Sequence, residues 1–374
     1  MRIAFLCKRR YMGKDVIADR YARLYEIPHQ LACLGHTVYG FCLSYKSHAE
    51  GRWEHAVPQG KLVWESRSLP PLIMPELLAY PCTLLKRIKE LAPDLIIGAS
   101  DIPHVVLGAW IARKLDVPYA ADLYDNFESF GQARIPGFVV ALRHAVRHAD
   151  LVTTTSEPLR DLVVEQYHAH GEIIAMPSTV DKAVFNHINR EDSRRALGLP
   201  LHAKLVGTAG GLHREKGVDT LYSAWPRISA EHSDVELVLA GPIDKAFPPP
   251  TGPRVRYLGM LPHASTANLF SALDVGVIYL RDTAFGRYCF PQKAYEMMAC
   301  ELPIVAARVG VMTHLLEALP DTLYQPDDAA DLARAVSEQL RKPSRPRITI
   351  DDWAAVIGAT ELKLRALVSS RRSA

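Results

Sequence analysis

The sequence of 374 residues predicts an α/β protein built from two doubly wound domains in tandem. Short apolar strands alternate with amphipathic helices through both halves of the chain, a pattern typical of parallel sheets covered on both faces. Hydrophobic residues make up 48% and charged residues 23% of the chain, which is enough apolar content for two full cores. The alternation relaxes once, over the polar and turn-rich residues 178–200, which we expect to connect the domains.

The first half opens with an apolar strand at 2–7, a loop at 8–15 and an amphipathic helix at 18–35. A second strand follows at 36–45. Three further segments at 84–100, 105–125 and 139–156 each read as a helix followed by a buried strand. This order predicts a parallel sheet for the first domain.

The second half repeats the alternation, with a strand into a glycine-rich loop at 203–211 and a helix at 218–229. Strands or helix–strand segments follow at 235–241, 255–261, 269–280 and 291–307, the last of them after an irregular loop at 281–290, and helices follow at 326–340 and 351–370. We expect domains at 1–182 and 183–345, with 346–374 returning as a helix toward the first domain. Ligands of such sheets bind beyond the carboxyl ends of the strands.

Bulk composition excludes several classes of protein. The net charge of +3 is too small to indicate nucleic-acid binding. The six cysteines form no C-x-x-C pair, which disfavours metal or disulfide frameworks and fits reduced thiols in the cytosol. No apolar run is long enough to span a bilayer and no signal peptide precedes the first strand. We therefore expect a cytoplasmic protein, with peripheral contact at the inner membrane face left open.

The glycine-rich loop at 207–217 is the first candidate binding element. Gly210 and Gly211 follow a strand and open onto a helix, so backbone amides can approach a phosphate. Arg214 and Lys216 add cations. The spacing fits neither the G-x-G-x-x-G fingerprint nor a P-loop, because Lys216 is followed by glycine. A tight strand-to-helix turn with solvated charges is the alternative interpretation.

A second candidate lies at 285–307, where Pro291 stands at the expected start of a helix. Lys293 and Glu296 follow, three residues apart on one face of that helix. A lysine suits a phosphate, and a carboxylate suits the two hydroxyl groups of a ribose. The alternative is an exposed i,i+3 ion pair worth only about 0.2–0.5 kcal/mol, which the apolar flanks of this stretch disfavour.

These motifs together resemble a known family. The stretches "GGLHREKGVDTLYSAW", "VELVLAGP", "VRYLGMLPH", "DVGVIYL" and "FPQKAYEMMACELPIVAARVG" are similar, in this order and spacing, to the donor-binding half of glycosyltransferase family 4. "ADLVTTTSEPLRD" and "MPSTVDKAVFN" extend the resemblance to the end of the first domain. The resemblance implies the GT-B fold, in which two Rossmann-like domains face each other across a cleft. It also implies a retaining transferase that uses a nucleotide-diphosphate sugar.

The resemblance assigns roles in the donor-binding half. It implies that Lys216 contacts the donor diphosphate, that Lys293 faces phosphate and that Glu296 holds the ribose. Two family residues are replaced: the arginine expected after the first glycine is absent, and the first glutamate of the family pair falls on Tyr288. We therefore expect compensating contacts to the donor from the side chains that remain nearby, which are His213, Arg214 and Tyr288.

The resemblance also points to residues in the first domain. Gly13 matches the glycine turn that lets the backbone approach the donor. Asp125 lies one residue past the position where many members carry a functional histidine, which is Tyr124 here. From their place after a strand, Asp101 and His104 are candidates for the acceptor side, although Asp101 equally suits a helix cap.

A resemblance of this kind implies chemistry without a protein nucleophile. Lys216, Arg214 and Asp125 are the candidate catalytic residues, and we expect no metal because the D-x-D pattern of metal-dependent transferases is absent. The implied acceptor is a hydroxyl of a glycan or lipid-linked molecule in surface-polysaccharide or lipopolysaccharide assembly. A basic helix at 139–150 fits an anionic membrane or an acidic acceptor, but we favour a solvated charged face.

Two alternatives stay open. A sugar-nucleotide epimerase of the same architecture would need acids and a histidine for proton transfer, although no motif supports it. A non-catalytic sugar-nucleotide binding protein would be consistent with the missing arginine and with Tyr288.

Overall fold

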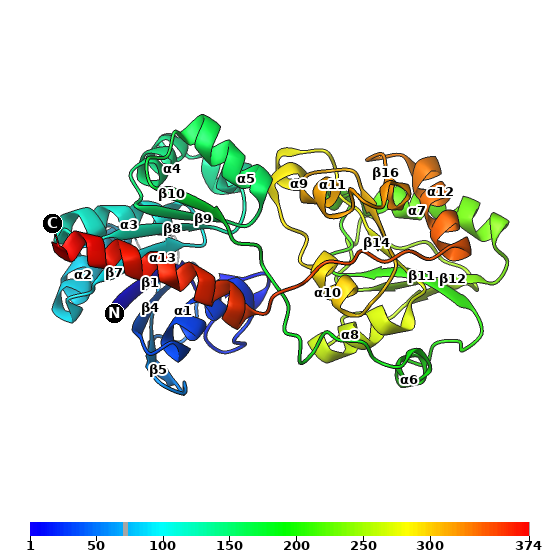
Figure 1. The fold of residues 1–374 in the computed structure, drawn as a ribbon, viewed down its shortest axis with the longest axis horizontal. Helices are drawn as coiled ribbons and strands as arrows, with labels where there is room; N and C mark the ends of the chain where they lie inside the picture. The colour runs from blue at the N-terminus through cyan, green and yellow to red at the C-terminus, as the bar shows by residue number, and fades with distance from the viewer. Residues whose placement is uncertain (70–73, 374) are drawn as a thin grey trace. The chain divides into compact units, whose positions relative to one another are not determined.

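The computed structural model describes residues 1–69 and 74–373 as two compact units, shown in Figure 1. The first unit comprises Met1–Ser178 and Trp353–Ala374, and the second comprises Thr179–Asp352. The sequence predicts 182 and 345 for the same two boundaries. Both units are α/β, with parallel sheets at their centres.

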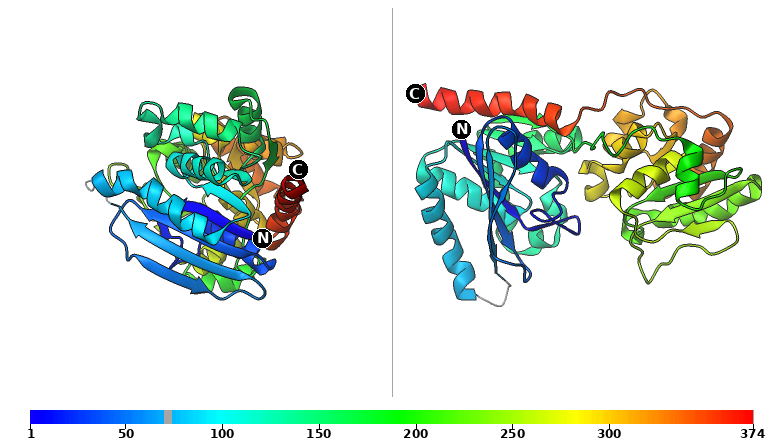
Figure 2. Two further views of the ribbon diagram at one scale, coloured as in Figure 1. Left: turned by 90° about the vertical axis from the view of Figure 1, so that its left-hand side faces the viewer. Right: turned by 90° about the horizontal axis from the view of Figure 1, so that it is seen from below.

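The first unit contains an eight-stranded sheet in the order β10-β9-β8-β7-β1-β4-β6-β5, parallel except for the β5–β6 pair. Because the chain moves outward from β1 in opposite directions, right-handed crossovers place α1 on one face and α2, α3 and α4 on the other (Figure 2). The strands are β1 (Arg2–Lys8), β4 (Thr37–Ser44), β5 (Gly51–His55), β6 (Lys61–Ser68), β7 (Leu95–Ala99), β8 (Tyr119–Leu123), β9 (Leu151–Thr154) and β10 (Glu172–Ala175).

The helices of this unit include α1 (Ala22–Cys33), α2 (Met74–Leu91), α3 (Ile102–Leu115), α4 (Phe138–Arg147), α5 (Glu157–Leu162) and α13 (Trp353–Ser373). Short helical turns are η1 (Phe127–Ser129), η2 (Gly131–Arg134) and η3 (Val163–Tyr167). The expected loop at 8–15 is wrong in detail, because β2 (Arg10–Tyr11) and β3 (Lys14–Asp15) pair there as a hairpin.

The C-terminal helix α13 lies beside α1 of the first unit (Figures 1 and 2). Its Glu361 is 3% exposed and lies 2.7 Å from the ring nitrogen Nε2 of His36. Trp353, Ile357 and Leu364 join the same apolar core as the first strand. This helix is therefore part of the first core although it follows the second unit in sequence.

A buried ion pair joins α1 to β8 inside the first unit. Arg23 and Asp122 are 0% and 1% exposed, and the guanidinium Nε donates to both carboxylate oxygens at 3.0 and 3.1 Å. The same guanidinium also donates to the backbone carbonyl of Met176, and Thr153 donates to Asp122. Because each charge is hydrogen-bonded by its neighbours, the burial of both is tolerated.

The second unit contains a six-stranded parallel sheet in the order β13-β12-β11-β14-β15-β16. Its strands are β11 (Lys204–Ala209), β12 (Val235–Ala240), β13 (Val255–Tyr257), β14 (Val275–Ile278), β15 (Ile304–Ala307) and β16 (Leu323–Tyr324). The residues of β11, β12, β14, β15 and β16 are nearly all buried, as expected for strands covered on both faces, whereas no residue of the edge strand β13 is buried.

The helices of the second unit are α6 (Arg190–Ala196), α7 (Val218–Glu231), α8 (His263–Ala272), α9 (Ala284–Tyr288), α10 (Lys293–Ala299), α11 (Val311–Leu315) and α12 (Ala329–Arg341), with turns η4 (Arg214–Lys216) and η5 (Pro320–Thr322). The irregular loop predicted at 281–290 is thus wrong in part, because α9 forms where Thr283 caps the backbone N–H of Gly286. Within the described residues, no helix is both long and apolar enough to cross a membrane.

Candidate functional site

The order of the second sheet brings the two predicted binding elements together. β11 runs into the glycine loop, and β14 lies next to β11. The chain leaves β14, forms α9, and enters α10 before returning as β15, which pairs with β14 (Figure 1). The loop after β11 and the N-terminal end of α10 therefore meet at the carboxyl edge of the sheet, where such folds bind ligands.

The glycine loop has a backbone that only glycine adopts easily. Gly210 has φ of +107° and Gly217, at the start of α7, has φ of +97°. A Cβ atom on Gly211 would lie 2.8 Å from the ring of His213 and 3.3 Å from Nζ of Lys216. The loop thus exposes backbone without side chains at Gly210 and Gly211, and the imidazole of His213 and the ammonium group of Lys216 lie next to it.

Lys293 approaches the same loop from α10. A Cβ atom on Gly210 would lie 3.5 Å from Lys293 Nζ, and this ammonium lies 4.6 Å from the ring centroid of Tyr279. The Tyr279 hydroxyl donates to the carbonyl of Gly211 at 2.9 Å, so the ring is fixed to the loop that the cation faces. Lys216 and Lys293 are the two cations that converge here.

Neither lysine has a carboxylate partner within 4.0 Å in the described part of the chain. Burial and then the neighbouring charge of Lys216 lower the pKa of Lys293 to about 8, although Glu296 raises it. Two cations held together without a counter-ion repel each other. The arrangement therefore favours an anion at the loop.

Glu296 lies one turn along α10 from Lys293 and is 9% exposed. Burial raises its pKa to about 7, and the charge of Lys293 opposes this rise. Its side chain makes no hydrogen bond to any described residue and no ion pair with Lys293. The simple i,i+3 ion pair is therefore not formed, and both carboxylate oxygens remain free to accept hydrogen bonds.

The side chain of Arg214 contacts an aromatic ring and a carboxylate. Its side chain is 67% exposed, with the guanidinium carbon 5.4 Å from the ring centroid of Phe247 and Nε 3.7 Å from Asp219. Asp219 also accepts a bidentate contact from Arg281. Arg214 is thus largely exposed, with an aromatic ring and a shared carboxylate as neighbours.

Tyr288 and Pro291 lie in the segment just before α10. Tyr288 is the last residue of α9 and is half-buried. The helix begins at Lys293, two residues later than predicted, and Pro291 lies before it with its carbonyl accepting from the N–H of Ala294 at 2.7 Å. Pro291 therefore shapes the first turn without belonging to the helix.

In the first unit, Asp101 and His104 form a buried pair at the carboxyl end of β7. Asp101 caps α3, accepting from the backbone N–H of His104 at 3.1 Å, and the imidazole Nδ1 lies 2.5 Å from the same oxygen. Burial opposes ionisation of Asp101, but His104 and then Lys8 lower its pKa overall. The hydroxyl of Tyr45 donates to the second carboxylate oxygen at 3.0 Å. The helix-cap interpretation of Asp101 is therefore confirmed, and its role on the acceptor side stays a prediction.

Asp125 and Gly13 both come after strands of the first sheet. Asp125 follows β8, and Gly13 follows β1 in the turn between β2 and β3. Asp125 is 8% exposed and accepts from the backbone N–H of Asn126 at 2.8 Å. Gly13 has φ of +83° in the β2–β3 turn, and nothing lies within 4 Å of a Cβ built on it. That turn is open enough for another molecule to approach its backbone.

Sequence reasoning missed Lys8, at the end of β1. Its Nζ donates to the hydroxyl of Tyr124 at 2.7 Å, and burial lowers its pKa against the opposing charges of Asp101 and Asp125. The signal was its position directly after the first buried strand, where the carboxyl edge of the sheet begins. No three His, Cys, Asp or Glu side chains of the described chain gather as a group able to hold a metal ion.

Two family models match the chain and together cover most of it. "Glycosyl transferase 4-like domain" matches residues 22–178, and "Glycosyl transferases group 1" matches residues 203–342. These ranges fall within the first and the second unit respectively.

Curated relatives are similar over part of their length. A putative teichuronic acid biosynthesis glycosyltransferase, TuaC, of Bacillus subtilis is 25% identical over 68% of this chain and 64% of its own. A D-inositol 3-phosphate glycosyltransferase of Corynebacterium kroppenstedtii is 30% identical over 51% of this chain and 46% of its own. The chain thus spans about half to two thirds of the length of these relatives.

Solved structures share the fold over the whole chain. Sucrose-phosphate synthase from Thermosynechococcus elongatus superposes with a TM-score of 0.75 at 20% identity, covering 99% of both chains. Anabaena Alr3699/HepE in complex with UDP gives a TM-score of 0.67 at 17% identity, covering 100% of this chain and 98% of that one. With both family models matched and this architecture in each unit, the chain belongs to the group 1 glycosyltransferases of the GT-B fold.

Proposed function

We propose that the protein is a retaining glycosyltransferase that moves a sugar from a nucleotide-diphosphate sugar to a hydroxyl of a glycan or lipid-linked acceptor. One observation carries this proposal. The ammonium groups of Lys216 and Lys293 converge on a bare glycine loop without a carboxylate partner in the described chain, beside a buried carboxylate, Glu296, that accepts no hydrogen bond there. Related structures that contain UDP or UDP-glucose support a nucleotide sugar as the donor.

The chemistry follows from charge. When the bond between the anomeric carbon and the diphosphate oxygen breaks, negative charge grows on the departing diphosphate. Cations and backbone N–H groups fixed at the glycine loop stabilise that charge more in the transition state than in the bound donor. The acceptor oxygen forms the new bond to the anomeric carbon, and its proton passes to an oxygen of the departing diphosphate. The products are a glycoside and a nucleoside diphosphate.

In this proposal each residue of the second unit has a defined task. Lys216 and Lys293 bind the diphosphate, and Glu296 accepts hydrogen bonds from the two ribose hydroxyls. His213 packs on the loop at Gly211 and is positioned to replace part of the missing family arginine. Tyr288 stands where the family places its first glutamate, so sugar recognition here uses a phenol or backbone groups. We place the reaction in the cytoplasm, in surface-polysaccharide or lipopolysaccharide assembly.

The donor nucleotide can be found by binding. We expect one of UDP, GDP, ADP and dTDP to stabilise the protein against unfolding, since a ligand at 100 times its dissociation constant adds about 2.7 kcal/mol to the free energy of unfolding. Failure of all four to stabilise the protein contradicts the proposal.

Turnover then separates the alternatives. Incubation of the matching nucleotide sugar without acceptor gives at most slow hydrolysis by a transferase, but a new nucleotide sugar from an epimerase. Glu296→Ala and Lys216→Ala should each abolish transfer and leave the thermal unfolding cooperative. Lys342→Ala, an exposed lysine of the same unit, should leave transfer unchanged. Near-native turnover of either site variant at saturating donor contradicts the assignment.

A further inference from the structure

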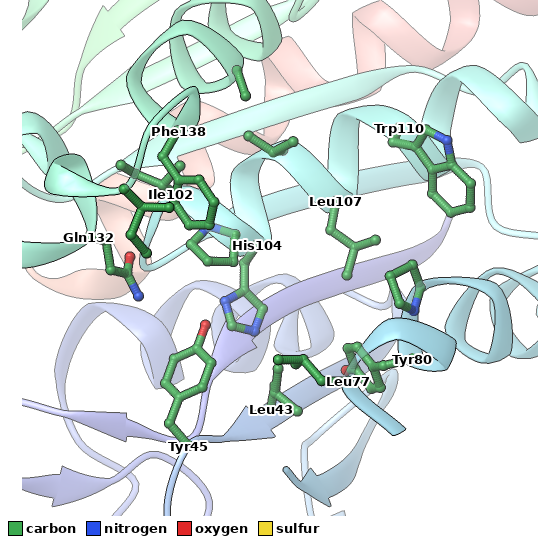
Figure 3. Close-up of a pocket in the computed structure, with 15 residues that line it drawn as sticks. Leu43, Tyr45, Leu77, Tyr80, Ile102, His104, Leu107, Trp110, Gln132 and Phe138 are labelled. Carbon is green, nitrogen blue, oxygen red and sulfur yellow. The ribbon is translucent and has the colours of Figure 1, made fainter. Parts of the chain in front are cut away.

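The first unit contains an apolar pocket of about 580 Å³ at the carboxyl end of β4 and the start of α3 (Figure 3). α2, α3, α4 and η2 surround it. Its lining is almost wholly apolar or aromatic, with Leu43, Leu77, Leu107, Trp110 and Phe138 among the contributing residues. A volume in this range is typical of sites for small organic ligands.

The sequence of α3 places apolar side chains along one wall of the pocket. The helix is apolar on two faces: Val105, Gly108 and Ile111 are buried, whereas Leu107 and Trp110 on the other face remain half-exposed. Apolar residues on both faces of a helix normally mean burial on both sides. Here one of those faces borders the pocket, so a bound apolar group would contact its side chains.

Exposed apolar side chains lie on the elements around the pocket. Ile135 lines it and is 45% exposed, Leu78 of α2 is 72% exposed, and Val140 of α4 is 73% exposed. Large apolar side chains left exposed on two helices and a turn around one pocket indicate contact with an apolar molecule or surface.

One member of the Asp101–His104 pair lines the pocket. His104 lines it and is 1% exposed (Figure 3). Nδ1 faces the carboxylate of Asp101, which leaves Nε2 as the ring nitrogen outside that contact. Nε2 is buried and has no hydrogen-bond partner among the described residues, which is costly for a polar atom. A hydroxyl of a bound molecule would satisfy it.

A cation stands near the same pair. The charges of Lys8 and Asp101 interact, and Lys8 ends β1, the strand next to β7. The region therefore combines an apolar cavity, an unsatisfied ring nitrogen and a cation at the carboxyl edge of one sheet. An amphiphile with an apolar chain, a hydroxyl and an anionic group near that hydroxyl matches all three.

We propose that this pocket binds the apolar chain of a lipid-linked acceptor and presents the polar end of that acceptor at His104 and Lys8. The inference rests on the proposed function, in which a lipid-linked molecule is one of the two acceptor classes, and it selects that class. In this arrangement His104 is a positioning residue for the acceptor, and the chain length of the lipid contributes to affinity.

Alkyl phosphates of different length test the proposal by calorimetric titration of the full chain. Each additional buried methylene contributes about 0.8 kcal/mol, which corresponds to about fourfold in dissociation constant. Dodecyl phosphate, titrated below its micelle concentration, should therefore bind at least tenfold more tightly than octyl phosphate, and methyl phosphate should not bind measurably. Equal affinities for the two alkyl phosphates, or no binding of dodecyl phosphate, would overturn the proposal.

Two pocket variants and one control locate the site. Leu107→Trp fills the pocket and Trp110→Ala removes a wall from it, so each should weaken dodecyl phosphate binding at least tenfold. Leu362→Trp, on an exposed face of α13, should not change it. Cooperative unfolding checks each variant, and Trp110→Ala serves as the second test if the larger side chain disturbs folding. Unchanged binding in a folded pocket variant would place the alkyl chain elsewhere.

Donor binding is measured separately in the same preparations. A chain that binds UDP but not dodecyl phosphate refutes only the lipid pocket. A chain that binds dodecyl phosphate in the pocket but neither a nucleoside diphosphate nor a nucleotide sugar refutes the proposed function instead.

Discussion

Replacing Lys293 by methionine should have opposite effects on stability and on donor binding. Methionine keeps an unbranched side chain over Tyr279 and removes the charge. In the protein without ligand, burial and the charge of the nearby Lys216 disfavour the charged form of Lys293 and lower its pKa from 10.5 to about 8. That fall in pKa lowers the free energy of unfolding by about 3 kcal/mol at pH 7. The reason is that the lysine of the unfolded chain carries its charge in water without these costs.

Two contacts reduce the expected gain in stability. The cation lies 4.6 Å from the Tyr279 centroid, a contact worth roughly 0.5–2 kcal/mol. Lys293 also lowers the pKa of Glu296, so its removal makes ionised Glu296 more costly. We therefore expect Lys293→Met to raise the free energy of unfolding by about 1–2 kcal/mol at pH 7. Because wild-type Lys293 loses its charge as the pH rises through about 8, the gain should shrink by pH 9.5.

The same variant should lose donor affinity, since a charge-assisted contact to phosphate is removed. Chemical denaturation at pH 7 and 9.5 measures the stability change, and calorimetric titration with UDP, or whichever nucleoside diphosphate stabilises the protein, measures affinity. We expect at least a tenfold weaker dissociation constant. Lys342→Met, an exposed lysine of the same unit, should change neither quantity. A destabilised Lys293→Met protein, or one that binds the nucleotide as well as wild type, would refute this reasoning.

Three further predictions concern the same contacts and the first core. Affinity for the nucleoside diphosphate should fall as the pH rises above 8, approaching tenfold per pH unit by pH 9.5, because deprotonation removes the Lys293 charge; a flat calorimetric profile over pH 7–9.5 would show that Lys293 does not face the phosphate. Glu296→Gln should retain or increase thermal stability at pH 8, where wild-type Glu296 is ionised against burial, while UDP affinity falls at least fivefold; a lower melting temperature would contradict the assigned cause of its raised pKa. Arg23→Met should lower the free energy of unfolding by about 3–5 kcal/mol in urea titration, because Asp122 stays buried without its partner, and a loss under 1 kcal/mol would mean that Asp122 is protonated or hydrated instead.

The sequence predicted the α/β architecture well because parallel strands buried on both faces are nearly continuous apolar runs. It missed β5 and β6, in which apolar and polar residues are mixed, as in the "RWEH" stretch of the antiparallel edge pair β5–β6, and it missed the short edge strand β10. Polar alternation on an edge strand resembles a loop when only buried runs are sought. The α9 helix was missed for a related reason, since it is only one turn long.

The candidate donor site was predictable in part. Local sequence patterns indicate Gly210, Gly211, Lys216 and the helix that begins at Lys293, because a glycine turn and a helix start are short-range features. No local pattern predicts the packing of Lys293 on Tyr279, since this packing depends on β14 lying beside β11 in the sheet. The apolar pocket of the first unit was not predicted either. Its walls come from segments far apart in sequence, and an apolar helix face has the same pattern whether it borders a core or a cavity.

Hydrogen–deuterium exchange with and without a saturating nucleoside diphosphate tests the central claim most directly, because it locates the ligand on the chain. We predict slower exchange of the backbone amides in 207–217 and 291–300, which contain the glycine loop and the start of α10. Protection confined to residues 1–178, or unchanged exchange in both peptides while calorimetry shows binding, would contradict the assignment of Lys216, Lys293 and Glu296 to the donor.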